Sequence, residues 1–129
     1  MGKLDIEKKI RDIFNKTFSC ITIKKKIPVS NNTSHEFDIF LQNKYIGGIN
    51  TSCWFNKSHS NNTGGQDRVS SELLWLSLYN GKERRIIILS DKEMFERINK
   101  KYSGCKFSYP IDIFFYDDSK CLIEQKYTL

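Results

Sequence analysis

Hydrophobic and polar residues follow two periods along the chain, one typical of helices and one typical of strands. Apolar residues at helical spacing predict an amphipathic helix over 4–18 and a strongly apolar helix over 67–79 that packs against a sheet. The segment 90–93 has the form of a capping box, which predicts a third helix ending near residue 102. Asn80-Gly81 predicts the end of the second helix, because glycine readily follows a helix C-terminus.

Six shorter segments carry the patterns of β-strands. Several of them alternate apolar with polar residues, whereas the isoleucine-rich run 85–89 is typical of a strand buried on both faces. A short polar turn at 42–44 joins the second and third strands into a predicted hairpin. The predicted strands cover 20–28, 35–41, 45–54, 85–89, 111–116 and 121–127.

The order of these elements predicts the fold class. A helix, three strands, a helix, a strand, a helix and two strands follow one another without an internal repeat or a linker. A mixed central sheet flanked by helices is the compact arrangement open to such an order, so we expect one α/β domain over 1–129. Within the second strand, alternation predicts Phe37, Ile39 and Leu41 on one face and Asp38 on the other.

The composition adds a preference for a polyanionic partner. Lys and Arg number 21 against 15 Asp and Glu, which gives a formal net charge of +6. Basic side chains displace counterions from phosphates, so this balance favours nucleic acid, although many basic proteins bind none. No signal peptide and no apolar run of membrane-spanning length are visible, so we expect a soluble, cytoplasmic protein with no membrane contact.

The cysteines do not form a metal-binding pattern. They lie far apart without a Cys-x-x-Cys pair, and the two histidines do not complete a zinc site. We therefore expect buried, reduced thiols. The cysteines are Cys20, Cys53, Cys105 and Cys121.

The predicted hairpin carries the most specific pattern in the chain. Residues 35–39 read HEFDI, and residues 45–52 read YIGGINTS. With the order of elements, which agrees over most of the chain, these segments resemble the core of the PD-(D/E)XK nucleases, a superfamily that includes many restriction enzymes. The resemblance implies a restriction-endonuclease-like core with an Asp on its second strand and Glu-x-Lys on its third. In that family the carboxylates hold Mg²⁺, and the Lys positions or activates the attacking water.

The chain departs from the family pattern at two of its three positions. Asp38 matches, but Gly48 stands at the Glu position and Asn50 at the Lys position. Gly48 offers only backbone atoms, and Asn50 can hydrogen-bond a water but carries no positive charge. We expect Asp38 to lie on a central strand, with its carboxylate open to solvent in a concave surface next to both of them.

Other residues are candidates to complete the site. Glu36 shares the predicted face of Asp38, and Glu72 lies in the following helix, where some members of the superfamily carry a migrated catalytic Glu. Lys57 or Arg68 is a candidate for the missing cation. An inactive site is the alternative hypothesis. If the site is active, Mg²⁺ is bound by Asp38 and Glu36, and the catalytic residues are Asp38, Asn50, Glu72 and Glu36.

The polar segment 56–68 is the predicted DNA contact. It lies between the hairpin and the next helix, where nucleases of this kind often touch DNA, and its side-chain types contact phosphates and base edges. A solvated, disordered loop is the alternative. The predicted contacts are Lys57, Asn61, Asn62, Gln66 and Arg68, together with Lys24 from the basic run 24–26.

These observations leave two main hypotheses for function. The first is a Mg²⁺-dependent endonuclease of the restriction type that acts on double-stranded DNA as a two-fold homodimer. The second is a non-catalytic DNA-binding or structural subunit that pairs with an active nuclease. Asp38 and the basic charge favour the first, whereas Gly48 and Asn50 favour the second. An interaction protein with no nucleic-acid role is a weaker third.

Overall fold

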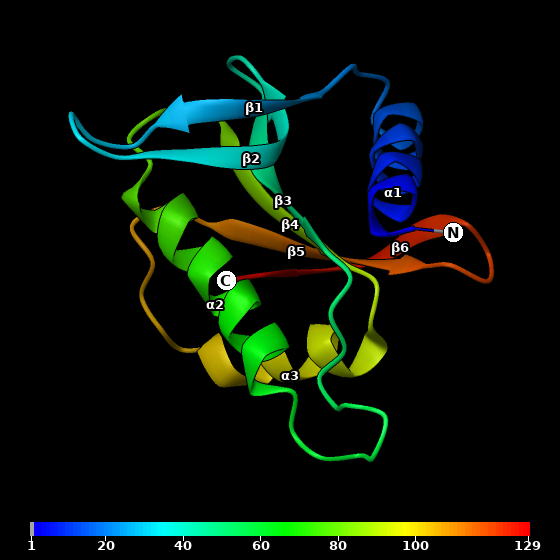
Figure 1. Ribbon diagram of the computed structural model, residues 1–129. Coiled ribbons are helices and arrows are strands. Elements are labelled where there is room, and N and C mark those ends of the chain that lie inside the picture. Colours follow the sequence, from blue (N-terminus) through cyan, green and yellow to red (C-terminus); the bar gives the residue numbers. More distant parts are fainter. Residues whose placement is uncertain (1) are drawn as a thin grey trace.

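A six-stranded mixed sheet forms the centre of the computed structural model, which describes residues 2–129 (Figure 1). The strands lie in the order β1-β2-β3-β4-β5-β6, so each one pairs with its neighbours in the sequence. The predicted order of elements and the predicted class, a mixed sheet flanked by helices, are confirmed. The strands are β1 (Ile23–Pro28), β2 (Ser34–Leu41), β3 (Tyr45–Asn50), β4 (Arg84–Leu89), β5 (Ile111–Asp117) and β6 (Leu122–Thr128), and the helices are α1 (Lys3–Thr17), α2 (Thr63–Leu78) and α3 (Lys92–Tyr102).

The middle of the sheet is parallel and its outer parts are antiparallel. β3, β4 and β5 run in one direction, because α2 and α3 return the chain to the starting edge after β3 and after β4. β1, β2 and β3 form an antiparallel meander, which confirms the predicted hairpin, and β6 lies antiparallel to β5. The carboxyl ends of β3 and β4 therefore lie at one edge of the sheet.

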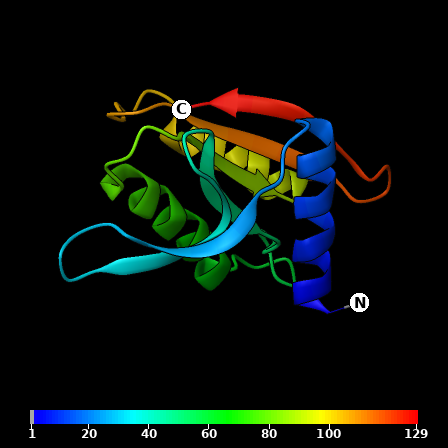
Figure 2. The ribbon, with the colours of Figure 1, turned by 90° about the horizontal axis from the view of Figure 1, so that it is seen from above.

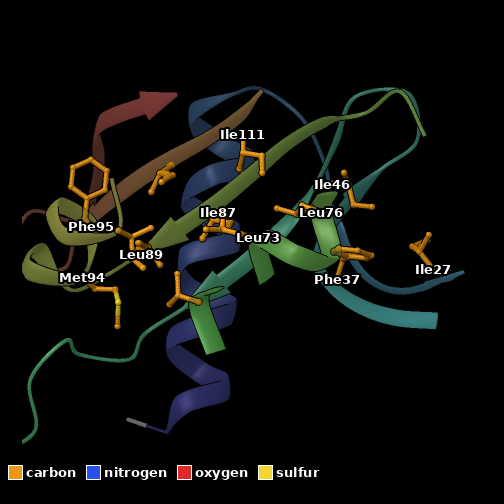
Figure 3. Close-up of a cluster of buried hydrophobic side chains, with 13 residues drawn as sticks. Ile27, Phe37, Ile46, Leu73, Leu76, Ile87, Leu89, Met94, Phe95 and Ile111 are labelled. Atoms are coloured by element: carbon orange, nitrogen blue, oxygen red, sulfur yellow. The ribbon is translucent and has the colours of Figure 1, made fainter. Parts of the chain in front are cut away.

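Helices cover both faces of the sheet, and the strands separate α1 from α2 (Figure 2). Leu76 of α2 and Phe95 of α3 belong to the larger cluster of buried side chains (Figure 3). Ile10 and Phe14 of α1 are fully buried in a second cluster, on the opposite face. The run 85–89 is buried at every position, as predicted for a strand covered on both faces.

β2 does not keep the predicted alternation of faces. Phe37 packs in the cluster that contains α2, whereas Ile39 packs in the cluster that contains α1. The pairing of β1 with β2 shifts register between Ile23 and Lys25, and the pairing of β2 with β3 extends no further than Ile39. Asp38 is therefore the residue at which β2 separates from β3.

The end of α2 lies within one residue of the prediction, but Gly81 does not form its cap. The helix ends at Leu78, and Tyr79 is already extended, with φ −65° and ψ 135°. The buried guanidinium of Arg85 donates to the carbonyl oxygens of Leu76 and Tyr79 at 3.2 and 2.7 Å. Because the last turn of a helix leaves carbonyls unpaired, an arginine from β4 supplies the termination that the glycine was expected to supply.

Other boundaries near the carboxyl edge also differ from the predictions. β3 ends at Asn50 instead of residue 54, and α2 begins at Thr63 instead of residue 67. Asn62 caps α2, and Asp91, one residue after the expected Ser90, caps α3. Each cap accepts a backbone N–H of the first turn with its side chain, which short polar side chains do well.

The predicted burial of the cysteines is also wrong. Cys20 is half-buried, while Cys53, Cys105 and Cys121 are exposed, and all of them are free thiols. None of the helices within residues 2–129 is long and apolar enough to cross a membrane.

Leu76→Ala should lower the free energy of unfolding by about 2–5 kcal/mol, because truncation of a fully buried leucine leaves a cavity. Leu74→Ala is the matched control: Leu74 lies on the same helix but is 57% exposed, so its truncation should change stability by less than about 0.5 kcal/mol. Urea unfolding measures both variants. Equal losses would contradict this orientation of α2.

Candidate active site

A cavity of about 530 Å³ opens where β2 separates from β3. Its walls come from α1, from the first three strands and from α2. Asp38, Asn50 and Glu72, all predicted catalytic residues, line this cavity. Lys24 and Arg68, predicted as DNA contacts, line it as well. Elements far apart in the sequence therefore contribute polar side chains to one concave surface.

Asp38 is held in the wall of the cavity by its side chain and by its backbone. Its Oδ2 accepts the N–H of Ile49 on β3 at 2.9 Å. Arg11 of α1 donates from Nε to the carbonyl oxygen of Asp38 at 3.0 Å. The side chain of Asp38 keeps only 17% of its exposure. The strand separation thus gives a carboxyl group that faces a cavity but has little contact with bulk water, so the prediction that it is open to solvent is wrong.

Glu7 of α1 shares a hydrogen bond with Asp38, and the two carboxyl groups titrate as a pair. Burial, and then the hydrogen bond and charge of Glu7, raise the pKa of Asp38 from its ordinary 3.8 to about 8. Burial acts on Glu7 too, but its hydrogen bonds with Asp38 and Lys24 lower the pKa of Glu7 overall. Two adjacent, buried carboxyl groups therefore favour retention of a proton by the pair.

Lys24 supplies one positive charge of this cluster, and Arg11 supplies another, with its Nη2 3.9 Å from Glu7 Oε1. The Nζ of Lys24 lies 3.4 Å from Glu7 Oε1, 3.8 Å from Asp38 Oδ1 and 3.9 Å from Glu36 Oε1. The register between β1 and β2 shifts at Lys24, which lies between the pairs Ile23–Phe40 and Lys25–Phe37 and so faces two residues of β2. The cation beside Asp38 is therefore a lysine from β1, a residue that the sequence indicated only as a phosphate contact.

Glu72 of α2 contributes a further carboxyl group with little exposure to solvent. Nε2 of His35 donates to Glu72 Oε1 at 2.8 Å, and the His35 ring stacks on Trp75 with 4.7 Å between centroids. Glu72 Oε2 is buried and has no hydrogen-bond partner within the described part of the chain. Burial raises the pKa of Glu72, and the hydrogen bond from His35 offsets part of that rise. A buried acceptor without a donor is uncommon and indicates room for a bound cation or donor.

Gly48 and Glu72 are sterically matched. A Cβ atom at position 48 would lie 2.9 Å from Cδ of Glu72 and 3.0 Å from its Oε2, which is too close for ordinary contacts. The carboxyl group of Glu72, extending from α2, therefore takes the space that a side chain on β3 would need. A glutamate at position 48 would collide with it.

Asn50 and Arg68 meet at the end of β3. Asn50 Oδ1 accepts the N–H of Ser52 at 2.8 Å, which turns the chain away from the strand. Arg68 donates from Nη2 to Ser52 Oγ at 3.2 Å. The side chain of Asn50 therefore shapes the rim of the cavity, where its amide group can hydrogen-bond a ligand but supplies no positive charge.

Glu36 and several predicted DNA contacts lie outside the cavity. The side chain of Glu36 is 60% exposed, and its Oε1 lies 3.9 Å from Lys24 Nζ. Asn62 and Gln66 use their side chains within the fold, donating to the carbonyls of Cys53 and Trp54 at 2.9 and 3.0 Å. Two further predicted contacts are exposed on the segment between β3 and α2 and line no part of the cavity: Lys57 and Asn61.

Glu7 and His35 are site residues that the sequence analysis missed. Glu7 carried a usable signal, since it lies three residues before Ile10 and seven before Phe14, on the buried side of α1. A carboxylate within an apolar stripe needs a partner, and this one finds Lys24. For His35 there was no such signal. Its partner Glu72 lies far along the chain, and the two residues meet only when β2 packs against α2.

The donor set suits a hard divalent cation. Asp38 and Glu72 offer carboxylate oxygens, and Oε2 of Glu72 lacks the partner that a buried oxygen needs. Among the side chains that the structure describes, no three His, Cys, Asp or Glu residues form a complete metal-binding group. Mg²⁺ typically takes only one or two protein carboxylates and completes its shell with waters and substrate phosphate, so two carboxylates fit it.

A scan against protein-family models, a search of curated proteins and a search of solved structures each found no match for this chain. The residues that line the cavity therefore carry the functional argument.

The stability of the protein should fall as pH rises from about 4 to 8, because folding raises the pKa of Asp38 to about 8. The folded state holds this proton more tightly than the unfolded chain, so its stabilising effect is complete below the ordinary pKa and is lost toward pH 8. Asp38→Asn should remove this loss and be more stable than the natural chain at pH 8 by more than about 1.4 kcal/mol, the equivalent of one pKa unit.

Thermal unfolding between pH 5 and pH 8.5 measures the effect. Asp12→Asn is the control, because Asp12 is an exposed carboxylate paired with Lys8 on the surface of α1. Parallel pH profiles for the natural chain and Asp38→Asn would show that Asp38 does not titrate in this way.

Gly48→Ala should destabilise the fold by about 1–3 kcal/mol, because the added methyl group overpacks against Glu72. In a Glu72→Ala background the same substitution should cost little, which gives a coupling energy above about 0.5 kcal/mol in a double-mutant cycle. Gly64→Ala in α2 is the control, since the nearest atom to its new methyl is 3.6 Å away. Additive effects of the substitutions at positions 48 and 72 would contradict the steric match.

Proposed function

We propose that this chain is a divalent-metal-dependent endonuclease of the restriction type that cuts double-stranded DNA. One observation carries the proposal: the carboxylate of Glu72 lies in the space above Gly48, in the same cavity as Asp38. The pair of carboxylates that the family pattern requires is thus available with its second member coming from α2 instead of β3. The order of strands and helices is compatible with the restriction-endonuclease-like core that the sequence resembles.

The proposed roles follow from the positions of the side chains. Asp38 and Glu72 would hold Mg²⁺, with Glu72 kept in orientation by its hydrogen bond to His35. The bound cation lowers the pKa of a coordinated water and offsets charge on the phosphate. Lys24 would attract the scissile phosphate and stabilise the negative charge that develops on its oxygens. Asn50 and Arg68 would bind the phosphate or a water at the rim.

Cleavage of both DNA strands requires two such sites. A two-fold homodimer, with one cavity in each protomer, remains the simplest assembly for that task.

A second candidate function, a non-catalytic DNA-binding subunit, is favoured by one contact. The ammonium group of Lys24 lies within 3.4–3.9 Å of the carboxylates of Glu7, Glu36 and Asp38. The lysine ammonium offsets the charge of these carboxylates without a metal ion, so the cluster could serve a purely structural role.

Metal binding and cleavage by substituted chains separate the two functions. Asp38→Asn and Glu72→Gln should each weaken Mn²⁺ binding and lower the rate of Mg²⁺-dependent DNA cleavage by about 10²-fold or more, since each removes a carboxyl group that would lose its proton and become a charged ligand when a cation binds. Lys24→Gln should also slow cleavage but should retain or strengthen Mn²⁺ binding, because it removes a competing positive charge. Calorimetric titration with Mn²⁺ and cleavage of supercoiled plasmid DNA are the measurements.

Glu36→Gln is the matched control, because Glu36 is an exposed carboxylate of the same strand and lies outside the cavity. A natural chain that binds DNA but neither binds Mn²⁺ nor cleaves would establish the non-catalytic function instead. Restoration of the family pattern then needs Gly48→Glu and Asn50→Lys together with Glu72→Ala, because the new glutamate would otherwise collide with Glu72.

A further inference from the structure

A second concave surface, here called the α3 groove, lies beside the segment that follows β3. Its volume is about 350 Å³, and it is formed by that segment, the first turn of α2 and the exposed face of α3. The lining residues include three basic side chains and no acidic one: Trp54, Gln66, Arg97, Lys100 and Lys101. In Figure 1, α3 and the start of α2 lie at the same end of the molecule, near the carboxyl ends of β3 and β4.

The backbone of Trp54, which lines the groove, is held by hydrogen bonds. The N–H of Trp54 donates to Asp91 Oδ2 at 3.0 Å, and Asp91 also caps α3. The carbonyl oxygen of Trp54 accepts the N–H of Asn62 at 2.9 Å and Nε2 of Gln66 at 3.0 Å. Hydrogen bonds to the caps of two helices therefore hold this residue in place before any ligand binds.

Arg97 is oriented within the groove by its neighbours. Its guanidinium lies 5.6 Å from the ring centroid of Trp54 and 5.0 Å from that of Phe55. Its Nε donates to Glu93 Oε2 at 2.7 Å, yet its side chain remains 48% exposed. The remaining N–H groups of a planar, oriented guanidinium suit the oxygens of a phosphate.

Lys100 and Lys101 add positive charge without internal compensation. They follow Arg97 by three and four residues, so all three lie on one face of α3. The two acidic residues of this helix are already paired, Glu93 with Arg97 and Glu96 with Lys92. The ion pairs within the described part of the chain include neither Lys100 nor Lys101. Uncompensated, exposed lysines beside an oriented arginine favour a polyanion.

The groove and the candidate active site are close enough to contact one duplex. Asn50 lines the cavity and Trp54 lines the groove, and four residues of chain span at most about 14 Å. That length corresponds to about four base-pair steps of DNA, at about 3.4 Å per step. Arg68 in the cavity and Gln66 in the groove also lie two residues apart on α2.

We propose that the α3 groove binds the phosphate backbone of duplex DNA within a few base pairs of the cleavage site. This inference rests on the proposed nuclease function and adds to it a contact surface on α3 that the polar segment 56–68 does not include. Arginine and lysine contacts to phosphates carry no sequence information, so the groove contributes affinity and register. Base recognition is left to other side chains.

The test is the salt dependence of binding to an intact duplex, measured without divalent metal so that the DNA is not cut. The double variant Lys100→Gln/Lys101→Gln should lower the slope of log K against log salt by about 1–2 in magnitude, since each lost phosphate contact removes about 0.9. Lys44→Gln/Lys82→Gln is the matched control, with the same change of charge. These exposed lysines lie in turns at the opposite edge of the sheet, where β3 and β4 begin.

The outcomes separate this inference from the proposed function. If the natural chain binds no duplex DNA at low salt, the nuclease proposal fails and the groove proposal fails with it. If the natural chain binds DNA and cleaves it, but the groove variant has the natural slope, only the groove proposal is overturned. Equal loss of slope in the groove variant and the control variant would also overturn it, because the effect would then reflect total charge.

Discussion

A carboxylate that is removed from water must be compensated by a charge or by hydrogen-bond donors, and this requirement ties the elements around the cavity together. Glu7, Asp38 and Glu72 come from α1, β2 and α2, and all three line one cavity. Their compensation comes from still other positions: the ammonium of Lys24 on β1, the N–H of Ile49 on β3 and the ring of His35. Each partner holds a different element in place. The orientation of α1 across from α2 therefore depends on the same contacts that prepare the site.

The cavity lies where the pairing of the strands is irregular. β2 pairs with β3 only from Ile39 onward, and the β1–β2 pairing shifts register at Lys24. A regular hairpin would have placed a side chain from each strand on alternating faces and closed the gap. Instead, Phe37 and Ile39 pack against helices on opposite faces, and Asp38 between them turns into the opening. Such departures from regular pairing are common next to active sites, because they redirect a side chain.

Gly48 and Glu72 fit together sterically, and the proposed nuclease site depends on that fit. In the proposed site the second carboxylate would come from α2, and glycine at position 48 leaves space for it. The positive charge of that proposed site would come from Lys24 on β1, since Asn50 carries none. Placing several carboxyl groups in one cavity is costly to the fold, as the raised pKa of Asp38 indicates. Such perturbed groups are common at functional sites. Lys24 partly compensates the negative charge of these carboxyl groups, because its Nζ lies 3.4 Å from Glu7 Oε1 and 3.8 Å from Asp38 Oδ1.

The hydrophobic pattern by itself determined the order of the elements, the antiparallel hairpin and the doubly buried strand at 85–89, because these depend on local periodicity. The resemblance of residues 35–39 and 45–52 to a nuclease motif, and not the hydrophobic pattern, indicated Asp38 and Glu72 as candidates for one site, and both line the cavity. Contacts between distant segments decided the rest. The end of α2 depends on Arg85, and the face on which Phe37 lies depends on the separation of β2 from β3. The position of Lys24 beside Asp38 depends on the shifted register between β1 and β2. The partnership of His35 with Glu72, and of Glu7 with Asp38, joins residues that no sequence spacing relates. Such pairs form only once the sheet and its helices have packed, since burial is what makes each charge require a partner.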